Sequence, residues 1–481
     1  MKTKKLLSIM LAAVLMTSVT GCEKKEETTA EIPTLKWYVG GDSESGLADV
    51  MAAANEILVE KLGCKLDLQV LDGSAYAEKI KLAMSSGDNF DLCWLDDAIY
   101  TDAIQKGGLL SMNEYLEGSV LNDVVPENIM DFGRYEGNVY AIPNIQIMAI
   151  PAAVWVREDL ANEYGLKKED VTAIEDIEPF LEWVKNNKTE YYPLRLTVGS
   201  QEMMRDYQDI AYDSFVSDII SAYEDENGEI QVVKTVDRKG YWELAELRHD
   251  WYKKGYIRKD IATITDDWDD VNMGKYAVYT NGYKPGGIEG HNSRVNGFQY
   301  VEMVVAKPYM SYAAGTGTMT GIGRNSKNPE LAFKLLELMN TDKELYNLIT
   351  FGVEGKNYTK NADGKIKIIP EGGYAANAGW KFGNQYNAYV LESQPDDVWE
   401  KTKEINETAR ASKLIGFKPD VSDIKLEISQ ISTVNGKYSS IKKGYDAVEN
   451  YKEQYMKDLE DAGIDRVLEV VEQQIEEWLA K

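Results

Sequence analysis

The clearest pattern of apolar and polar positions lies in the first quarter of the chain. Three β-type runs, at 35–39, 65–71 and 90–95, are separated by apolar residues at helical spacing, at 47–58 and 76–84. This alternation predicts a parallel sheet whose strands are joined by right-handed helical crossovers. Ligands of such sheets bind beyond the carboxyl ends of the strands, so we expect the residues that follow these three strands to form a site.

Residues with known capping preferences predict where several helices begin and end. Gly63 is expected just beyond the first helix, and Ser74 is expected to cap the second. The segment Thr341–Glu344 has the form of a capping box. Later runs continue the α/β theme, with a strand at 275–280 and an amphipathic helix at 467–479.

Length and charge narrow the classes of function. A chain of 481 residues predicts more than one core, because single cores stop growing at roughly 250–300 residues. The 80 acidic residues outnumber the 53 basic ones, which argues against nucleic acid or an anionic membrane surface as the main partner. Only His249 and His291 are available for histidine-based catalysis or zinc binding.

The N-terminus has the features of an export signal. Lys2, Lys4 and Lys5 precede an apolar stretch at 6–19 that is too short to span a bilayer comfortably. The stretch ends in Val19-Thr20-Gly21-Cys22, which resembles a bacterial lipobox. We therefore expect residues 1–21 to be a lipoprotein signal peptide and residues 22–33 to be a tether. An ordinary secretory signal is the alternative.

If Cys22 carries the lipid, it anchors the protein on the extracytoplasmic face of the cell membrane. The other two cysteines, Cys64 and Cys93, lie in strand-like runs and are interpreted as buried thiols. A disulfide between them stays open, because it depends on their separation in the fold. Their spacing does not suggest a metal site, and we expect neither a metal nor a cofactor.

Several motifs occur in the order found in extracellular solute-binding lipoproteins of carbohydrate ABC importers. The chain resembles family 1 of these proteins, and its end resembles the uncharacterised C-terminal region of the LipO-type subgroup. The matching segments lie at 76–92, 107–112, 136–143, 157–160, 273–277, 326–332, 383–387, 414–417 and 462–465. Each motif is weak alone, and their order over nearly the whole chain carries the resemblance.

The resemblance implies a bilobal, periplasmic-binding-protein-like type II fold: two α/β lobes, a hinge and a helical C-terminal region. Lobe 1 would comprise 34–146 plus 317–365, and lobe 2 would comprise 147–316 plus 366–481. The chain would cross between lobes near 144–151 and 308–321. A monomer would trap its ligand between the lobes by hinge closure and deliver it to a membrane permease.

The residues after the first-lobe strands suit a sugar, which offers apolar faces to aromatic rings and hydroxyls to polar groups. Trp94 and Asp97 match a tryptophan and an aspartate of maltodextrin-binding relatives, and Asp42 matches another sugar-contacting aspartate. Asp96 is a further candidate. The relatives' next arginine is Ala98 here, which argues against maltodextrin itself. Alternatively, Trp94 is a core residue and the two aspartates cap a helix.

Candidates from the second lobe follow the predicted crossing and a predicted strand. Trp155 and Arg157 come soon after the crossing, while Asn281 and Tyr283 follow the strand at 275–280. By resemblance, Trp380 is a lid aromatic. Ordinary structural roles stay open for these residues: a turn at Asn281, a surface salt bridge at Arg157 and a core anchor at Trp380.

These features predict a receptor that captures an oligosaccharide without changing it and has no catalytic residues. A peptide-binding importer component is one alternative, and a surface-anchored glycoside-processing enzyme is another. Adjacent Asp96 and Asp97 cannot converge on one glycosidic bond as a catalytic pair must. The acidic run Asp266–Asp270 is interpreted as a solvated loop, with a contribution from calcium left open.

Overall fold

The computed structural model describes residues 32–196, 211–264, 266–374 and 378–480. Residues 33–481 form one compact unit, which is described here by itself. The predicted signal peptide, Cys22 and most of the predicted tether lie outside the described residues. Among the helices of the described part, none has the length and apolar character needed to cross a membrane.

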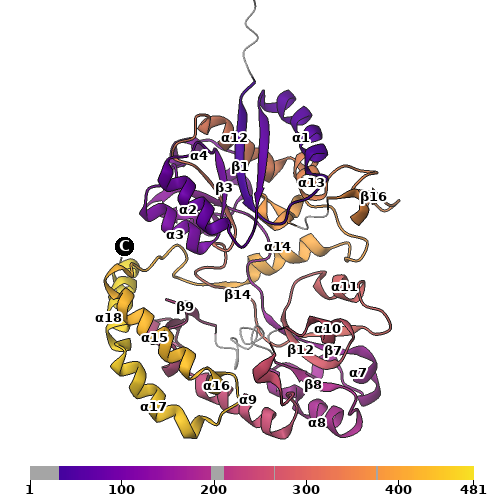
Figure 1. Cartoon of the computed structure of the whole chain (residues 1–481), viewed down its shortest axis with the longest axis vertical. Helices are drawn as coiled ribbons and strands as arrows, with labels where there is room; N and C mark the ends of the chain where they lie inside the picture. The colour runs from indigo at the N-terminus through magenta and orange to yellow at the C-terminus, as the bar shows by residue number, and fades with distance from the viewer. Residues whose placement is uncertain (1–31, 197–210, 265, 375–377, 481) are drawn as a thin grey trace, which may run out of the picture. The chain divides into compact units, whose positions relative to one another are not determined.

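The first lobe is built on a five-stranded sheet with the order β2-β1-β3-β15-β6. Its strands are β1 (Thr34–Gly40), β2 (Lys65–Leu71), β3 (Leu92–Leu95), β6 (Ala141–Pro143) and β15 (Met319–Ile322). Figure 1 shows two of these strands, β1 and β3, in the first lobe. β1 pairs in parallel with both β2 and β3, which confirms the predicted parallel arrangement. β15 returns from far along the chain and pairs antiparallel with β3 and β6. The first lobe therefore depends on two distant stretches of sequence.

Helices cover this sheet and extend its core. They are α1 (Leu47–Leu62), α2 (Tyr76–Ser86), α3 (Asp97–Gln105), α4 (Asn113–Leu116), α5 (Leu121–Val124), α6 (Glu127–Met130), α12 (Pro329–Thr341) and α13 (Lys343–Phe351). Two short hairpins, β4 (Arg134–Tyr135) with β5 (Asn138–Val139) and β16 (Tyr358–Lys360) with β17 (Ile366–Ile368), complete it.

The helix ends confirm one prediction and correct two. Gly63 follows α1 with φ 66°, as a left-handed C-terminal residue does. The carboxylate of Asp72, not Ser74, accepts the backbone N–H groups before α2. Asp342, not Thr341, is the N-cap of α13 and accepts the N–H of Leu345. In both cases a neighbouring aspartate supplies the capping oxygen.

The first-lobe core does not follow the predicted boundary at residue 365. Ile366, Phe382 and Ala388 are buried in the same core as Leu35 and Trp37. The ring of Phe382 meets that of Trp37 edge to face, with centroids 5.3 Å apart. The segment after 365 therefore packs on the first lobe, whereas the sequence assigned it to the second.

The second lobe contains a four-stranded sheet with the order β13-β7-β12-β8. Its strands are β7 (Ala152–Arg157), β8 (Tyr192–Arg195), β12 (Tyr276–Gly282) and β13 (Tyr300–Val304), and its helices are α7 (Glu158–Tyr164), α8 (Glu178–Asn187), α9 (Tyr241–Lys254), α10 (Trp268–Asn272) and α11 (Gly287–Asn292). β12 runs antiparallel to β7 and parallel to β8. The first residues of β7 and the last residues of β12 therefore lie side by side at the same end of the sheet's strands.

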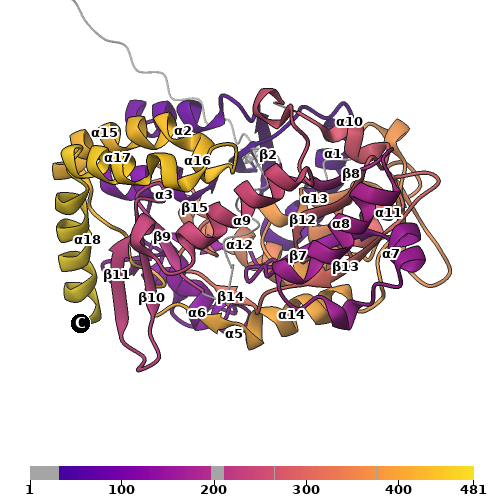
Figure 2. The same cartoon turned by 90° about the horizontal axis from the view of Figure 1, so that it is seen from below.

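A third core joins a small sheet to the end of the chain. The sheet has the order β11-β10-β9 and comprises β9 (Asp213–Phe215), β10 (Ile220–Glu224) and β11 (Ile230–Lys234). Against it lie the C-terminal helices, α15 (Lys425–Lys437), α16 (Ser439–Lys442), α17 (Val448–Asp461) and α18 (Ile464–Leu479). Figure 2 shows α18 beside β10 and β11. α18 confirms the predicted terminal helix.

Three stretches of chain connect the lobes. Two are the predicted crossings, which follow β6 and precede β15. The third contains α14 (Val398–Thr408) and β18 (Arg410–Ala411), and β18 pairs with β14 (Tyr309–Met310) of the second crossing. Asn406 of α14 accepts the N–H of Met148 at 2.8 Å and donates to the carbonyl of Gln146 at 2.6 Å. The third connection is therefore hydrogen-bonded to both crossings.

A buried asparagine joins the two crossings to the rest of the first lobe. Asn144 is 1% exposed, and its amide donates to Thr318 Oγ1 and to the carbonyl of Lys381, both at 2.9 Å. Its Oδ1 accepts the N–H of Gly383 at 3.0 Å and the hydroxyl of Thr320 at 3.2 Å. Removing this amide would leave several buried polar groups without their partner.

We expect Asn144→Ala to lower the free energy of unfolding by about 2–4 kcal/mol, because unpaired buried polar groups each cost about 1–3 kcal/mol. Urea denaturation followed by circular dichroism measures the change. Asn296→Ala at an exposed position serves as the control and should stay within about 0.5 kcal/mol of the parent. Equal values for the two variants would contradict this role.

Candidate functional site

The carboxyl ends of β1 and β3 are held together by one buried tyrosine. The hydroxyl of Tyr76, on α2, donates to the carbonyl of Trp94 at 2.7 Å and lies 3.0 Å from that of Tyr38. A Cβ on Gly40 would come within 2.9 Å of the Tyr76 ring, so only glycine fits at the end of β1. This packing fixes the backbone from which Asp42 and Trp94 project.

Trp94 is the centre of an aromatic cluster at this edge. Its indole N–H donates to Thr318 Oγ1 at 2.8 Å, and its ring is half-buried. The ring centroid lies 5.8 Å from that of Trp380, edge to face, and 5.6 Å from that of Tyr76. Thr318 in turn donates to the carbonyl of Trp380 at 2.9 Å. We call Trp94 and Trp380 the indole pair.

A lysine that the sequence did not single out lies against the indole pair. Lys381 Nζ is 4.8 Å from the Trp380 ring centroid and 5.5 Å from that of Trp94, and it donates to the carbonyl of Gly40. Burial lowers the pKa of Lys381, and the nearby carboxylate of Asp42 acts in the opposite direction. Its position directly after Trp380 was the only signal in the sequence.

Asp42 and Lys381 line a cavity of about 160 Å³ beside the indole pair. Val39, Val70 and Phe382 form part of its apolar wall, and Asp42 is exposed. The arrangement combines flat rings, an ammonium group and a carboxylate on one face of the first lobe. Such a combination can stack on a sugar ring and hydrogen-bond its hydroxyls.

The two adjacent aspartates each have a bonding partner in the structure. Asp96 is the N-cap of α3, and its Oδ1 accepts the N–H of Ile99 at 2.8 Å, as the capping alternative described. Asp97 forms an ion pair with Lys418, whose side chain is 5% exposed and which precedes the C-terminal helices. Each aspartate therefore has one oxygen engaged, and their roles in ligand binding stay predictions.

Two second-lobe candidates lie in the core of that lobe. Trp155 is 5% exposed, and its indole N–H donates to Glu302 at 2.7 Å. Arg157 is 6% exposed, donates to the carbonyl of Gly274 at 2.6 Å and pairs with Asp159. Both side chains are therefore engaged within the second lobe, and their roles in ligand binding stay predictions.

The other two second-lobe candidates lie near the crossings. β12 extends through Gly282, so Asn281 belongs to the strand and pairs with Ala153 at the start of β7. The N–H of Tyr283 donates to the carbonyl of Pro151 at 2.8 Å. Both residues are partly exposed at the sheet edge from which the first crossing enters the lobe. Asn281 and Tyr283 therefore remain candidates for ligand binding.

An exposed tryptophan of the second lobe was missed. Trp268 is 56% exposed, and the Arg195 guanidinium lies 4.7 Å from its ring centroid. Arg195 ends β8 and forms a buried ion pair with Asp267, which also accepts the hydroxyl of Tyr276 at 2.8 Å. The sequence did contain a signal for this exposed ring, because a tryptophan is unusual within an acidic run such as 266–270. That run was interpreted as a solvated loop.

Two carboxylates of the acidic run have cationic partners. Asp267 pairs with Arg195, and Asp270 pairs with both Arg258 and Lys275. Within the described ranges, no group of three or more His, Cys, Asp or Glu side chains could hold a metal ion. Cys64 and Cys93 are both buried and not bonded to one another, as the buried-thiol interpretation predicted.

Comparison with known proteins decides the family. The profile described as bacterial extracellular solute-binding protein matches residues 43–345, which is more than half of the chain. The chain belongs to the bacterial extracellular solute-binding proteins. Such proteins act outside the cytoplasm. A second profile, described as a domain of unknown function (DUF3502), matches residues 413–480 and so covers the C-terminal helices.

Relatives of this solute-binding protein are named for carbohydrate transport. A carbohydrate ABC transporter substrate-binding protein from Streptococcus pneumoniae is 28% identical over 96% of this chain and 94% of its own. The crystal structure of the N-glycan transport solute-binding protein NgtS from the same species has a TM-score of 0.82 at 26% identity, covering 93% of this chain and 99% of that one. The predicted type II bilobal fold is confirmed.

Further structures extend the comparison. The complex of NgtS with Man5GlcNAc matches with a TM-score of 0.68 at 26% identity, over 93% of this chain and 99% of that chain. The alginate-binding protein AlgQ2 matches with a TM-score of 0.60 at 16% identity, over 93% of this chain and 98% of its own, which shows a shared fold alone.

Glu302 gives the second lobe of this solute-binding protein a predictable pH response. Burial raises the pKa of Glu302 to about 7, although the bond from Trp155 opposes the shift. Between pH 4.5 and about 7 the unfolded chain releases this proton while the folded chain keeps it, so stability falls as pH rises through this window.

We therefore expect Glu302→Gln, which keeps an acceptor for Trp155, to gain stability over the parent as pH rises from about 4.5 to 7. The gain should reach up to about 3 kcal/mol and is measured by urea denaturation across that range. His291 is present in both proteins, so its own titration cancels in the difference. Exposed Glu169→Gln is the control, and a pH-independent difference for Glu302→Gln would refute the assignment.

Proposed function

We propose that this protein is the substrate-binding component of an ABC importer and captures an oligosaccharide between its two lobes. The observation that carries the proposal is the indole pair with Lys381 at the carboxyl ends of β1 and β3. Family membership and the names of its relatives support the same function. The protein delivers the sugar to a membrane permease without changing it chemically.

The first lobe supplies the principal binding face. Trp94 and Trp380 stack on the apolar faces of sugar rings, while Asp42 and Lys381 hydrogen-bond the hydroxyls. The indole N–H of Trp94 is already bound to Thr318, which fixes the ring plane before any ligand arrives. A fixed ring loses little entropy on binding, so more of its contact energy appears as affinity.

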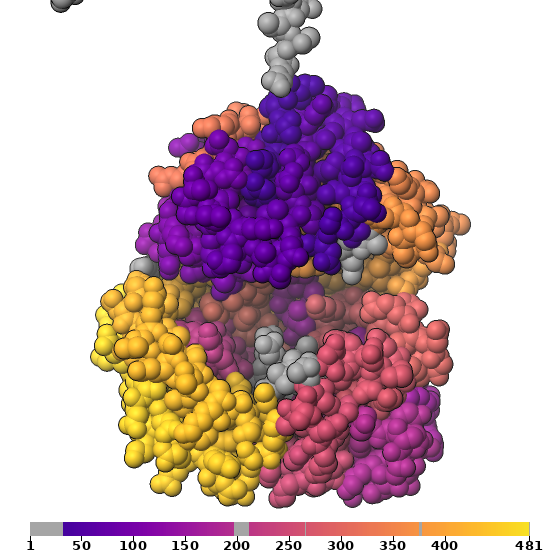
Figure 3. Space-filling model, viewed as in Figure 1, coloured from indigo at the N-terminus to yellow at the C-terminus, as the bar shows by residue number. Residues whose placement is uncertain are grey.

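The second lobe supplies the opposing face through Trp268 with Arg195 beneath it, together with Asn281 and Tyr283. The space-filling view shows a hollow between the indigo residues of the first lobe and the later residues of the second (Figure 3). A ligand that contacts both lobes favours their closure by hinge motion. Aromatic groups from both sides would then enclose the sugar.

The N-terminal features add a location to this function. We infer that Cys22 is acylated after removal of residues 1–21 and anchors the protein to the extracytoplasmic face of the cell membrane. Residues 22–33 then act as a tether long enough for a monomer to reach its permease. The anchor keeps the receptor beside the transporter.

We expect thermal unfolding of the purified protein to shift upward with oligosaccharides and not with peptides. Man1GlcNAc and Man5GlcNAc, the ligands in the NgtS complexes, are the first to test, beside fructo-oligosaccharides and short peptides. A ligand at 100 times its dissociation constant adds about 2.7 kcal/mol. Shifts with peptides alone would replace the proposal with peptide capture, and release of a shorter glycan would indicate an enzyme.

Two tryptophan substitutions test the binding face directly. We expect Trp268→Ala to weaken glycan binding by about 1–3 kcal/mol in calorimetry, with little change in stability because the ring is exposed. Trp94→Ala should weaken binding by a similar amount and also lower stability, since its ring is half-buried.

Trp183 of α8 is the matched control, because its partly buried ring packs in the second-lobe core. Trp183→Ala should lower stability while the folded protein keeps its affinity. If folded Trp94→Ala and Trp268→Ala both retain full affinity, these rings are not the binding face.

A further inference from the structure

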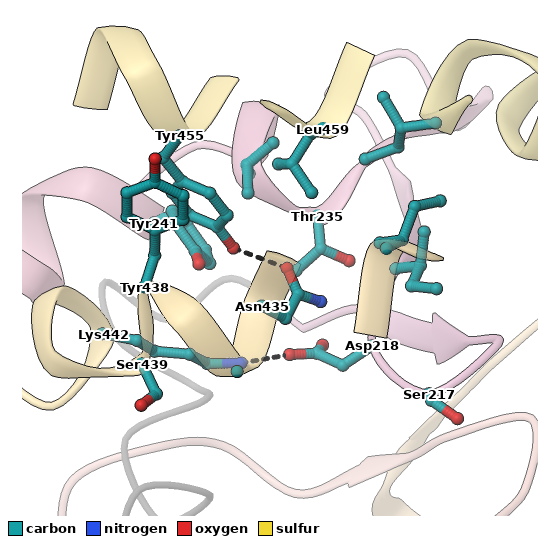
Figure 4. Close-up of a pocket in the computed structure, with 15 residues that line it drawn as sticks. Ser217, Asp218, Thr235, Tyr241, Asn435, Tyr438, Ser439, Lys442, Tyr455 and Leu459 are labelled. Carbon is teal, nitrogen blue, oxygen red and sulfur yellow. Dashed lines mark hydrogen bonds and ion pairs between the residues drawn. The ribbon is translucent and has the colours of Figure 1, made fainter. Parts of the chain in front are cut away.

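A cavity of about 270 Å³ lies where the C-terminal helices meet the small sheet of the second lobe (Figure 4). One wall comes from α15, α16, α17 and the start of α18. The other comes from the turn between β9 and β10, the segment Thr235–Asp237 and the start of α9. Neither wall encloses the space alone, and junctions of this kind are preferred positions for ligand sites.

The cavity has an apolar floor and a polar rim. Ile219, Ile431 and Leu459 are buried beneath it, each no more than 2% exposed. Ser217 and Ser439 contribute hydroxyl groups to its lining. A molecule with apolar C–H faces and several hydroxyl groups matches such a surface.

The charges of the lining cancel. Asp218 and Lys442 form an ion pair of 2.6 Å and are the only acid and base among the cavity's described lining residues. Tyr241 and Tyr455 also line it, and burial raises the pKa of both phenols above the usual value, so they are neutral. An ionised ligand would meet no unpaired opposite charge here, which favours a neutral one.

Asn435 is held in a defined orientation at the cavity. Its Oδ1 accepts the hydroxyl of Tyr455 at 2.7 Å, so its amide nitrogen points away from that ring. Figure 4 shows the amide of Asn435 between Tyr455 and Thr235. Thr235 Oγ1 lies 2.9 Å from Ser221 Oγ, which also fixes the hydroxyl. The lining therefore presents oriented polar groups above an apolar floor.

The turn at the rim is conformationally strained. Val216, Ser217 and Asp218 have φ values of 54°, 58° and 66° in succession. Each such residue costs on the order of 1–3 kcal/mol, and a β-branched valine is especially unfavourable. Ser214 Oγ and Lys442 Nζ hold Asp218 in place. Strain of this kind is concentrated at ligand-binding sites, and two of the three residues line the cavity.

We propose that this cavity binds a neutral polyhydroxy molecule the size of a single monosaccharide. Its volume of about 270 Å³ is of the size that one sugar ring needs. The site is separate from the indole pair and goes beyond the oligosaccharide function, on which it does not depend. It gives residues 413–480, matched by a domain of unknown function, a ligand-binding role.

The test uses protein carrying Trp94→Ala, so that binding at the indole pair is already weakened. N-acetylglucosamine, mannose and myo-inositol are titrated individually and followed by saturation-transfer NMR. We expect at least one to bind, and we expect added Asn435→Leu to weaken that binding at least tenfold. Asn450→Leu, at an exposed position on α17, is the matched control and should leave binding unchanged.

Hydrogen exchange provides a second measurement on the parent chain, which covers the case in which Asn435→Leu does not fold. The bound probe should slow exchange of the amides at 217–219 and 435–442. Failure of all three probes to bind up to their solubility limits overturns the proposal. So does binding that is equal in Asn435→Leu and Asn450→Leu, or protection confined to residues near Trp94. Protection confined to residues near Trp94 would instead support sugar binding at the indole pair, and the other outcomes leave oligosaccharide capture untouched.

Discussion

The hydrogen bonds of Asn144 and Thr318 are the constraint on which the candidate site depends. Thr318 Oγ1 accepts from the indole of Trp94 and from the amide of Asn144, and it donates to the carbonyl of Trp380. Asn144 begins the first crossing, and Thr318 ends the second. The second crossing is therefore bonded to both tryptophans proposed to contact the sugar, and the first crossing is linked to them through Thr318. A change in the backbone of the crossings would therefore alter the positions of Trp94 and Trp380.

This arrangement explains why the binding face is built from three distant parts of the chain. Trp94 lies in β3, and Thr318 directly precedes β15. Trp380 and Lys381 belong to a segment whose Phe382 is buried in the first-lobe core. Each part alone would leave polar groups unpaired in a partly buried environment, which costs free energy. When the three parts come together, their polar groups hydrogen-bond one another. These bonds hold the two tryptophans in place within the first lobe, and in the proposed function closure would add the second face.

The sequence predicted what depends on local pattern and missed what depends on distant contacts. The alternation in residues 34–96 was enough to give β1, α1, β2, α2 and β3, because neighbouring strands and helices there follow one another directly. Burial of Trp155 and Arg157 could not be predicted, since it arises from Glu302, Gly274 and the rings around them, far along the chain. The role of the 266–270 run also depended on a distant residue, Arg195, which neutralises Asp267. Capping was misassigned at α2 and α13, where an aspartate one or two residues from the expected position supplies the oxygen.

Both proposed binding faces place a cation against an indole in a protein with net charge −27. Lys381 lies against the indole pair, and Arg195 lies on Trp268. Arg195 is paired with buried Asp267, and the carboxylate of Asp42 lies near Lys381, so each cation has a nearby negative charge that weakens its field. Their N–H groups act over hydrogen-bond distances, where sugar hydroxyls and ring oxygens accept them. The acidic excess therefore contributes solubility, while the proposed faces combine apolar rings with short-range donors, as recognition of a glycan requires.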